Sequence, residues 1–337
     1  MKKIIVQYLI ILLVLTSSVF SGCKQQSEPV YTNPLILQRA DPMIVRAESG
    51  TYYFIATVPE FDRIEIRKAE TINALADAEP VVVWRRHESG PMTYHIWAPE
   101  LHRINNTWYI YFAAGHSENR WKIRMFALSN KSDDPTQGTW VEEGQIATNR
   151  DAFALDATVF ENKGELFYVW AEKTRPSNSS GMLISKMENP VTLTGSQVII
   201  TEPEFEWEKH TYAVNEGAAV IKRNGKIFIT FSASATDHTY AMGLLWADEN
   251  ANLTDPASWN KLPEPVFYTN EELSRFGPGH NQFTIAEDGK TDLMVYHARD
   301  YKEIKGSSLA DPNRHTRVRM LRWTKDGFPD FRQDNDD

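Results

Sequence analysis

The stretch Asn224-Gly225-Lys226-Ile227-Phe228-Ile229-Thr230 places a tight-turn dipeptide directly before a run of β-branched and aromatic residues. Asn and Gly tolerate the positive φ angles of a two-residue hairpin turn, and the run that follows favours a β-strand. The same arrangement occurs four more times along the chain. The other turns contain Ser49-Gly50, Asn105-Asn106, Lys163-Gly164 and Asp288-Gly289, and the strand-like runs after them begin at Tyr52, Trp108, Leu166 and Leu293.

The spacing of these turns predicts the architecture. Their second residues fall at positions 50, 106, 164, 225 and 289, so the unit repeats every 56 to 64 residues. A unit of this length holds about four short strands, which is the content of a propeller blade. No long helical pattern separates the turns, and Asp-Pro pairs mark loops instead. We therefore expect an all-β fold, a single-domain five-bladed β-propeller over residues 33–330, with a pair of β-sandwiches as the alternative.

A polar residue precedes each turn by six to nine positions, inside a strand-like run. If each turn joins the innermost strand of a blade to the second strand, these five side chains lie at matching heights around the axis. Crowded carboxyl groups raise one another's pKa values and destabilise the fold unless something offsets them, so their convergence predicts a functional site. A salt-bridged acid at a strand end is the alternative for any one of them. The five residues are Asp41, Glu100, Asp156, Glu216 and His280.

The segments around these residues resemble the blade motifs of glycoside hydrolase family 43, and the resemblance covers nearly the whole chain after residue 33. It implies a five-bladed propeller that hydrolyses glycosides with inversion of configuration, as arabinofuranosidases, arabinanases and β-xylosidases of that family do. The matching segments are Arg39-Ala40-Asp41-Pro42, Trp97-Ala98-Pro99-Glu100, Leu155-Asp156-Ala157 and Val214-Asn215-Glu216-Gly217.

The resemblance also implies catalytic roles. Asp41 would be the general base, Glu216 the general acid, and Asp156 the third acid that orients the proton donor and tunes its pKa. These roles agree with the needs of an inverting enzyme, in which a protonated and an ionised carboxyl group flank the bond roughly 6.5–9.5 Å apart. A third carboxylate nearby would keep Glu216 protonated by like-charge repulsion. Glu100 resembles a supporting position.

Four further residues are expected near the substrate. His280 resembles a histidine that contacts a metal ion, often calcium, through water; the chemistry itself needs no cofactor, and hydrogen bonding to nearby acids is the alternative because calcium prefers oxygen ligands. Arg299, in Tyr296-His297-Ala298-Arg299, resembles an arginine that reaches the active centre, with a surface salt bridge as the alternative. Trp97 and His95 are expected to form walls of a sugar subsite.

The substrate expectation is also one of resemblance. Asn215-Glu216-Gly217 and the stretch Asp311-Pro312-Asn313-Arg314-His315 resemble the exo-acting α-L-arabinofuranosidase branch of the family. This implies release of L-arabinofuranose from arabinan or arabinose-substituted plant glycans, with exo and endo cleavage both left open. A β-xylosidase of the same family is the alternative. A non-catalytic glycan-binding surface lipoprotein is an alternative of another class, but it would be expected to lack one of the three acids.

The N-terminus resembles a bacterial lipoprotein signal peptide over residues 1–22. Lys2 and Lys3 precede an apolar run from Ile4 to Leu15, which is shorter than the roughly 20 residues of a membrane span. Cys23 is the only cysteine of the chain and stands where lipidation would occur, although Phe20 departs from the usual small aliphatic residue. We expect an exported protein anchored in the cell envelope by a lipid on Cys23, with residues 23–32 as a tether and residues 331–337 as a polar tail.

The charge of the chain bears on its partners. Removing residues 1–22 takes away two lysines and no acids, which moves the formal net charge from −9 to −11. Nucleic-acid affinity depends on cationic contacts with phosphates, so an acidic protein of this kind is not expected to bind nucleic acid. The expected partners are an oligo- or polysaccharide substrate and the membrane.

Overall fold

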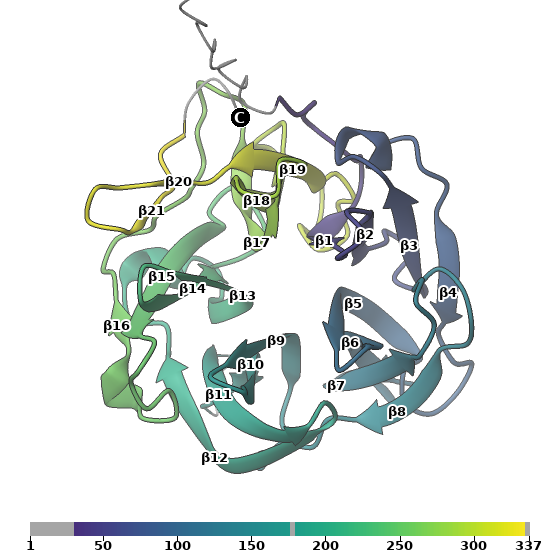
Figure 1. Ribbon diagram of the computed structural model, residues 1–337. Helices are drawn as coiled ribbons and strands as arrows, with labels where there is room; N and C mark the ends of the chain where they lie inside the picture. The colour runs from purple at the N-terminus through teal and green to yellow at the C-terminus, as the bar shows by residue number, and fades with distance from the viewer. Residues whose placement is uncertain (1–29, 176–178, 334–337) are drawn as a thin grey trace, which may run out of the picture. The chain divides into compact units, whose positions relative to one another are not determined.

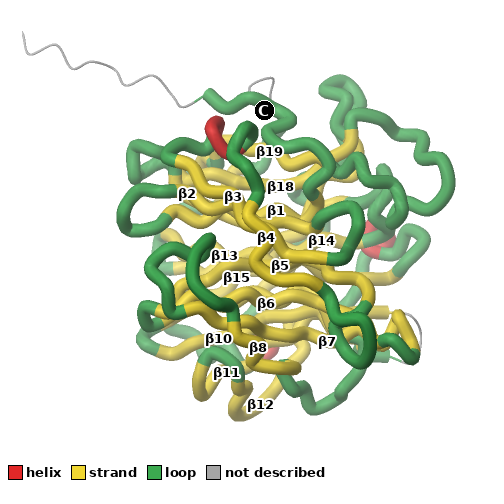
Figure 2. Tube along the Cα trace, turned by 90° about the vertical axis from the view of Figure 1, so that its right-hand side faces the viewer, coloured by secondary structure: helices red, strands yellow, loops and turns green. Residues whose placement is uncertain are grey.

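The computed structural model describes residues 30–175 and 179–333, so the predicted signal peptide, Cys23 and the end of the tail lie outside the described residues. Residues from Tyr31 onward form one compact unit. Within it, five blades of antiparallel strands surround a central axis (Figure 1), and a short parallel pairing of Ser179 and Ser180 with Ala213 and Val214 links the third blade to the fourth. The turned view in Figure 2 shows strands throughout the unit and only short helical turns. The prediction of a five-bladed β-propeller is confirmed.

The five blades follow one another along the chain. Blade I consists of β1 (Ala40–Arg46), β2 (Tyr52–Thr57), β3 (Arg63–Ala69) and β4 (Val81–Arg85). Blade II consists of β5 (Tyr94–Ile104), β6 (Thr107–His116), β7 (Asn119–Asn130) and β8 (Val141–Gln145). Blade III consists of β9 (Ala154–Asn162), β10 (Glu165–Lys173), β11 (Ser179–Asn189) and β12 (Thr192–Thr201). Blade IV consists of β13 (Ala213–Arg223), β14 (Lys226–Ala233), β15 (Ala241–Asp248) and β16 (Asn260–Lys261), and blade V of β17 (Phe276–Ile285), β18 (Asp292–Arg299) and β19 (His315–Met320).

A few small elements complete the unit. A hairpin of β20 (Arg322–Trp323) and β21 (Pro329–Asp330) follows blade V. The helical elements among residues 30–175 and 179–333 are three 3₁₀ turns, η1 (Asn73–Leu75), η2 (Glu206–Glu208) and η3 (Pro256–Ser258). No helix among the described residues is long and apolar enough to cross a membrane.

The expected turns join the innermost strand of each blade to the second strand. In blades II, III and IV the turn consists of the two predicted residues, and in blades I and V it is a few residues longer. The innermost strands β1, β5, β9, β13 and β17 contact one another in a closed ring. Side chains on these strands therefore converge on the axis.

Five hydrophobic clusters lie between neighbouring blades and hold the ring together. Each cluster combines side chains of two adjacent blades, for example Ile55 with Leu101 between blades I and II. Because both faces of a blade are covered, a strand such as β2 is buried along its whole length and lacks the apolar–polar alternation of a half-exposed strand. The cluster that contains Ile44 and Val295 joins blade V to blade I and closes the ring.

The N-terminal segment completes blade V, which the sequence analysis did not foresee. Leu35 donates its backbone N–H to the carbonyl of Thr316, and Thr316 donates to the carbonyl of Ile36, so this segment pairs with β19 on the outer side of the blade. The two ends of the propeller are thereby joined by backbone hydrogen bonds. Such closure depends on residues 280 positions apart, and local sequence patterns do not report it.

Both boundaries of the folded unit differ from those expected. Tyr31, placed in the tether, donates its hydroxyl to Glu287 and packs against the blade V–blade I cluster. Phe331, placed in the polar tail, is buried in the cluster of blades IV and V. An aromatic side chain at each end extends the packed core beyond residues 33–330.

Candidate active site

Each innermost strand is interrupted by a β-bulge at an equivalent place. The ladder to the second strand breaks after Ala40, Trp97, Leu155, Glu216 and Gly279 and resumes three residues later. In every bulge the second residue has a positive φ angle, which outside turns is rare for residues other than glycine and often accompanies functional sites. These residues are Asp41 (φ 53), Ala98 (φ 43), Asp156 (φ 55), Gly217 (φ 62) and His280 (φ 45).

The bulges correct the expectation that the five polar residues lie at matching heights. Asp41, Asp156 and His280 are equivalent, but Glu216 stands one position earlier and Glu100 two positions later. Glu100 is paired with Gln282, its equivalent in blade V, and accepts a hydrogen bond from His102 at 2.8 Å. It therefore belongs to a separate layer of the axis, and its side chain is occupied by protein partners.

A cavity of about 740 Å³ opens over the bulges. Asp41, Asp156, Glu216 and His280 all line it, so the structure brings together the three proposed catalytic acids and the histidine. Its other lining residues come from blades II to V and the connecting loops. They include Trp97, Trp121, Phe153, Tyr212, Leu309 and Arg314.

Asp41 is surrounded by hydrogen-bond donors. Its Oδ1 accepts from Arg314 at 3.1 Å and lies 3.2 Å from His280 Nδ1, and its Oδ2 accepts from the Thr57 hydroxyl at 2.6 Å. Burial alone would raise the pKa of Asp41, but the charge of Arg314 and the hydrogen bond from Thr57 outweigh it and hold the pKa well below its usual range. Asp41 is therefore ionised at neutral pH.

Asp156 and Glu216 are in the opposite situation. Burial, together with the negative charges of Glu216, Asp41 and Glu100, raises the pKa of Asp156 well above its usual range. Burial also raises the pKa of Glu216 to about 7, against the opposing effects of the Tyr240 hydrogen bond and Arg314. The two carboxyl groups thus keep a proton at a pH where ordinary carboxyl groups are ionised.

Gly217 fixes the relation between Glu216 and Asp156. Its backbone N–H donates to Asp156 Oδ2 at 3.2 Å, which ties the strand of the proposed acid to the third carboxyl group. A Cβ atom at this position would stand 3.1 Å from the His280 ring, and the φ angle of 62° also disfavours a side chain. A glycine is therefore required at position 217, directly after the proposed acid.

His280 is held by the acids. Its Nδ1 lies between Asp41 and Asp156, 3.8 Å from the latter, and burial lowers its pKa, so the ring is neutral. Within residues 30–175 and 179–333, no three His, Cys, Asp or Glu side chains are grouped so as to hold a metal ion. The donor set does not fit a directly bound calcium ion, and a water-mediated ion near His280 stays a prediction.

The arginine beside the base is Arg314 rather than Arg299. Arg299 is buried and uses its guanidinium to hold the loop of residues 300–314, donating to Asp311 at 3.0 Å, to the Ser308 carbonyl at 2.8 Å and to the Thr236 carbonyl at 2.7 Å. This loop carries Arg314 to Asp41. Sequence analysis singled out the stretch that contains Arg314 without giving this arginine a role, because only the folded loop shows that it reaches Asp41. Arg299 does not line the cavity.

An aromatic cluster forms one wall of the cavity. The His95 ring contacts both Trp97 and Trp121, with ring centroids 4.3 Å and 4.9 Å away, and the two tryptophan centroids are 6.3 Å apart. Trp97 and Trp121 line the cavity, and Trp121 is 47% exposed. Burial and the charge of Arg120 lower the pKa of His95 to about 4, so the ring is uncharged. Trp97 thus lines the cavity and His95 packs against it, while their roles in a sugar subsite stay predictions. Sequence analysis did not single out Trp121.

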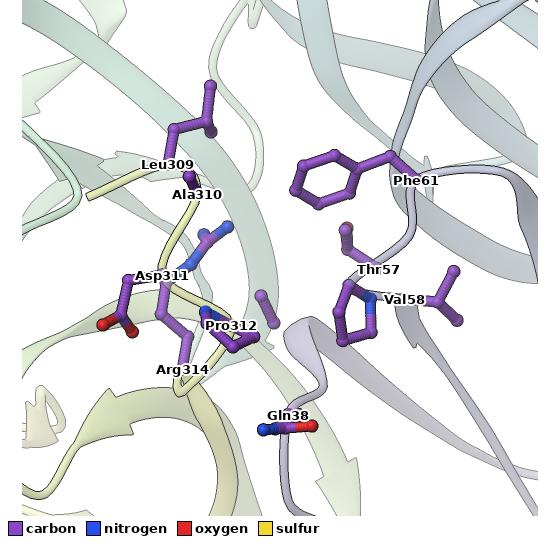
Figure 3. Close-up of a pocket in the computed structure, with 11 residues that line it drawn as sticks. Gln38, Thr57, Val58, Phe61, Leu309, Ala310, Asp311, Pro312 and Arg314 are labelled. Atoms are coloured by element: carbon purple, nitrogen blue, oxygen red, sulfur yellow. The ribbon is translucent and has the colours of Figure 1, made fainter. Parts of the chain in front are cut away.

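A second, small cavity of about 20 Å³ lies beside Asp41, with Phe61 and Leu309 facing each other across it (Figure 3). Thr57 and Arg314 also line it, and both donate hydrogen bonds to Asp41. Leu309 and Arg314 border the large cavity as well. They form the partition between the two spaces.

Comparisons with known proteins agree with this geometry. The α-L-arabinofuranosidase 43 of Humicola insolens is 50% identical over 319 residues, which cover 94% of this chain, although the chain spans only 66% of that relative's length. The extracellular exo-α-(1→5)-L-arabinofuranosidase of Streptomyces chartreusis is 52% identical, with 82% of this chain and 84% of the relative covered.

A solved structure is equally similar. The crystal structure of an α-L-arabinofuranosidase from Lactobacillus brevis superposes with a TM-score of 0.87 at 50% identity, covering 89% of this chain and 96% of that one. The family model of glycosyl hydrolases family 43 matches residues 31–329, almost the whole described unit. The chain is therefore a member of glycosyl hydrolases family 43.

Proposed function

We propose that this chain is an exo-acting α-L-arabinofuranosidase that inverts configuration, with Asp41 as general base, Glu216 as general acid and Asp156 as the residue that orients Glu216 and tunes its pKa. The observation that carries the proposal is the contrast in protonation. One carboxyl group in the cavity is held ionised by Arg314, and a second keeps a proton up to a pH of about 7. An inverting glycosidase needs this combination.

The reaction follows from these states. Asp41 accepts a proton from water as the water oxygen bonds to the anomeric carbon. The bond from that carbon to the leaving oxygen breaks, and Glu216 gives its proton to the leaving oxygen. Two carboxyl groups and water balance the step without a cofactor. Each proton transfer contributes on the order of 10²- to 10⁴-fold to the rate.

The substrate is proposed from the relatives and from the cavity. The relatives from Humicola insolens and Streptomyces chartreusis, each at least 50% identical, are named for release of L-arabinofuranose, the latter from α-1,5 linkages. The aromatic wall of Trp97 and Trp121 offers flat apolar faces on which a sugar ring can stack. We take Trp97 and Trp121 as substrate-binding residues, His95 as their support, and Arg299 as the residue that holds the loop of Arg314.

Export and a lipid on Cys23 complete the proposal. The Streptomyces relatives are named extracellular, which supports export of this chain. The lipid rests on the sequence Val19-Phe20-Ser21-Gly22-Cys23 alone. Mass spectrometry of the membrane fraction should find a diacylated N-terminal cysteine, and Cys23→Ser should release the protein from membranes. Recovery of unmodified wild type in the soluble fraction would contradict the anchor.

The substrate is tested by hydrolysis assays. The protein should release arabinose from p-nitrophenyl α-L-arabinofuranoside and, as monomer, from linear α-1,5-arabinan. p-Nitrophenyl β-D-xylopyranoside should be a poor substrate. Preferred cleavage of the xyloside would favour the β-xylosidase alternative, and early release of arabino-oligosaccharides would show endo cleavage. Binding of arabinan without hydrolysis of any substrate would favour the glycan-binding alternative.

The stereochemical claim has its own measurement. Proton NMR during the first minutes of hydrolysis of an α-linked arabinoside should show the β-anomer of arabinose before mutarotation. Early appearance of the α-anomer would mean a retaining mechanism and would exclude the assigned roles.

A further inference from the structure

Tyr240 lies outside the motifs that carry the family resemblance, yet it contacts the proposed general acid. It stands just before β15 and is buried, with 1% of its surface exposed. Its hydroxyl donates to Glu216 Oε1 at 2.9 Å. With the phenol donating to Oε1, Oε2 is the oxygen left to carry and donate the carboxylic proton of Glu216.

The surroundings of Tyr240 fix its ring. On one side the chain runs through Gly279, where a Cβ atom would stand 2.6 Å from Tyr240 Cε1 and would displace the ring. On the other side the ring stacks on His297 at a centroid distance of 5.7 Å and an interplanar angle of 8°. The tyrosine hydroxyl is therefore delivered to Glu216 from a rigid position.

His297 links Tyr240 to the proposed base, Asp41. Its Nδ1 accepts the backbone N–H of Asp41 at 3.0 Å and lies 3.4 Å from Asp41 Oδ1. The ring is fully buried, and burial lowers the pKa of His297 far below its usual range, so the ring is neutral and can accept this bond. Two stacked rings thus lie between the carboxyl groups of blades I and IV.

We propose that Tyr240 is a positioning residue for Glu216: its hydroxyl selects Oε2 as the oxygen that protonates the leaving group, and its ring, stacked on His297, sets the separation between acid and base. The proposal deepens the proposed function and rests on the assignment of Glu216 as general acid. It also accounts for Gly279 in the segment Gly277-Pro278-Gly279, because the inner strand of blade V has to leave space for the tyrosine.

Tyr240 also has a measurable effect on protonation. Its hydrogen bond favours the ionised form of Glu216 and opposes the rise of the pKa that burial causes. Removing the hydroxyl should therefore raise the pKa of Glu216. The ionisable and charged groups that line the cavity with Glu216 are Asp41, Asp156, Lys173, Tyr212, His280 and Arg314, and Tyr240 contacts Glu216 directly.

The test is Tyr240→Phe, which keeps the stacked ring and removes one oxygen. We expect kcat/KM on arabino-oligosaccharides to fall about tenfold, the alkaline limb of its pH profile to move up by about one unit, and little loss on a dinitrophenyl arabinoside. Tyr168→Phe is the matched control, because Tyr168 is fully buried in blade III and its hydroxyl has no hydrogen-bond partner within the described residues. It should leave the pH profile unchanged.

An unmoved alkaline limb in a folded Tyr240→Phe variant, or equal losses on both substrates, would overturn the proposal. If that variant does not fold, Gly279→Ala serves instead, because it displaces the ring and should cause the same selective loss on oligosaccharides. Equal losses on both substrates in Gly279→Ala would overturn the proposal as well. Failure of the proposed function is distinguishable, since wild type itself would then release no arabinose.

Discussion

Asp41 and Glu216 both line the same cavity from innermost strands, but their neighbours differ in charge. Arg314, Thr57 and two histidine rings surround Asp41. Glu216 has a tyrosine hydroxyl as its hydrogen-bond donor and a second carboxyl group, Asp156, close by. Burial acts on both groups, yet the pKa falls at Asp41 and rises to about 7 at Glu216.

The difference shows that an equivalent position on an inner strand does not by itself determine whether a carboxyl group acts as the base or as the acid. The five bulges provide equivalent backbone positions, and residues carried by loops that join strands within a blade then distinguish them. Arg314 comes from the loop before β19, and Tyr240 from the connection before β15. Arg314 donates a hydrogen bond to Asp41 but acts on Glu216 only through its charge, so changing these neighbours should move the pH profile in predictable directions.

The largest effect is expected from removing the base. Asp41→Ala should lower kcat/KM by on the order of 10²- to 10⁴-fold on oligosaccharides and on activated arabinosides alike, because water has to be deprotonated whatever group leaves. Steady-state kinetics on both substrate types measures this. Activity within threefold of wild type on either substrate would exclude Asp41 as the base.

Removing the cation should have the next largest effect. Arg314→Met leaves the buried Asp41 without its closest positive charge, so its pKa should rise and the acidic limb of kcat/KM should move up by about one unit or more. Arg314 also lowers the pKa of Glu216, so the alkaline limb should move up too. Arg317→Met is the matched control, since Arg317 pairs with Asp300 outside the large cavity. A downward shift of the acidic limb would contradict this account.

Asp156→Asn tests the coupling of the two protonated groups. The two carboxyl groups interact, so their protons leave in steps that belong to the pair, and the charge left by the first loss holds the second proton. An amide cannot carry that charge, so the alkaline limb should move down by about half to one unit. The pH profile on arabino-oligosaccharides measures the shift. An upward shift would mean that Asp156 does not act on Glu216 through its charge.

The smallest effect is expected at the aromatic wall, away from the acids. Trp121→Ala should raise KM for arabino-oligosaccharides several-fold, as expected for loss of one stacking contact worth about 1 kcal/mol, with little change on a nitrophenyl arabinoside. Tyr268→Ala is a suitable control, because Tyr268 is 55% exposed and does not line the cavity. Equal KM values for wild type and Trp121→Ala would show that Trp121 does not contact the substrate.

The fold was predictable because its repeat is local. Turn dipeptides such as Asn224-Gly225 and the strands beside them lie within ten residues of one another. Five copies of this turn-and-strand pattern predict five blades. Closure of the ring was not predictable, since it depends on Ile36 meeting Thr316 across the whole chain. The packing of Phe331 was missed for the same reason.

The site was predictable only in part. Asp41, Asp156 and Glu216 stand in short motifs on inner strands, and they do line one cavity. Their neighbours Arg314 and Tyr240 come from loops, where no periodicity indicates which side chain turns inward. The bulges also shift Glu216 by one position relative to Asp41, and a register count from the turns does not resolve such a shift.

The most direct test of the central claim compares Glu216→Ala with Asp41→Ala on substrates of different leaving-group quality. A dinitrophenolate leaves without protonation, whereas a sugar hydroxyl needs the proton of the general acid. The account predicts that Glu216→Ala loses on the order of 10²- to 10⁴-fold in kcat/KM on arabino-oligosaccharides but much less on dinitrophenyl α-L-arabinofuranoside, while Asp41→Ala loses comparably on both. If the activated substrate rescues Asp41→Ala and not Glu216→Ala, the acid and the base are exchanged and the account is contradicted.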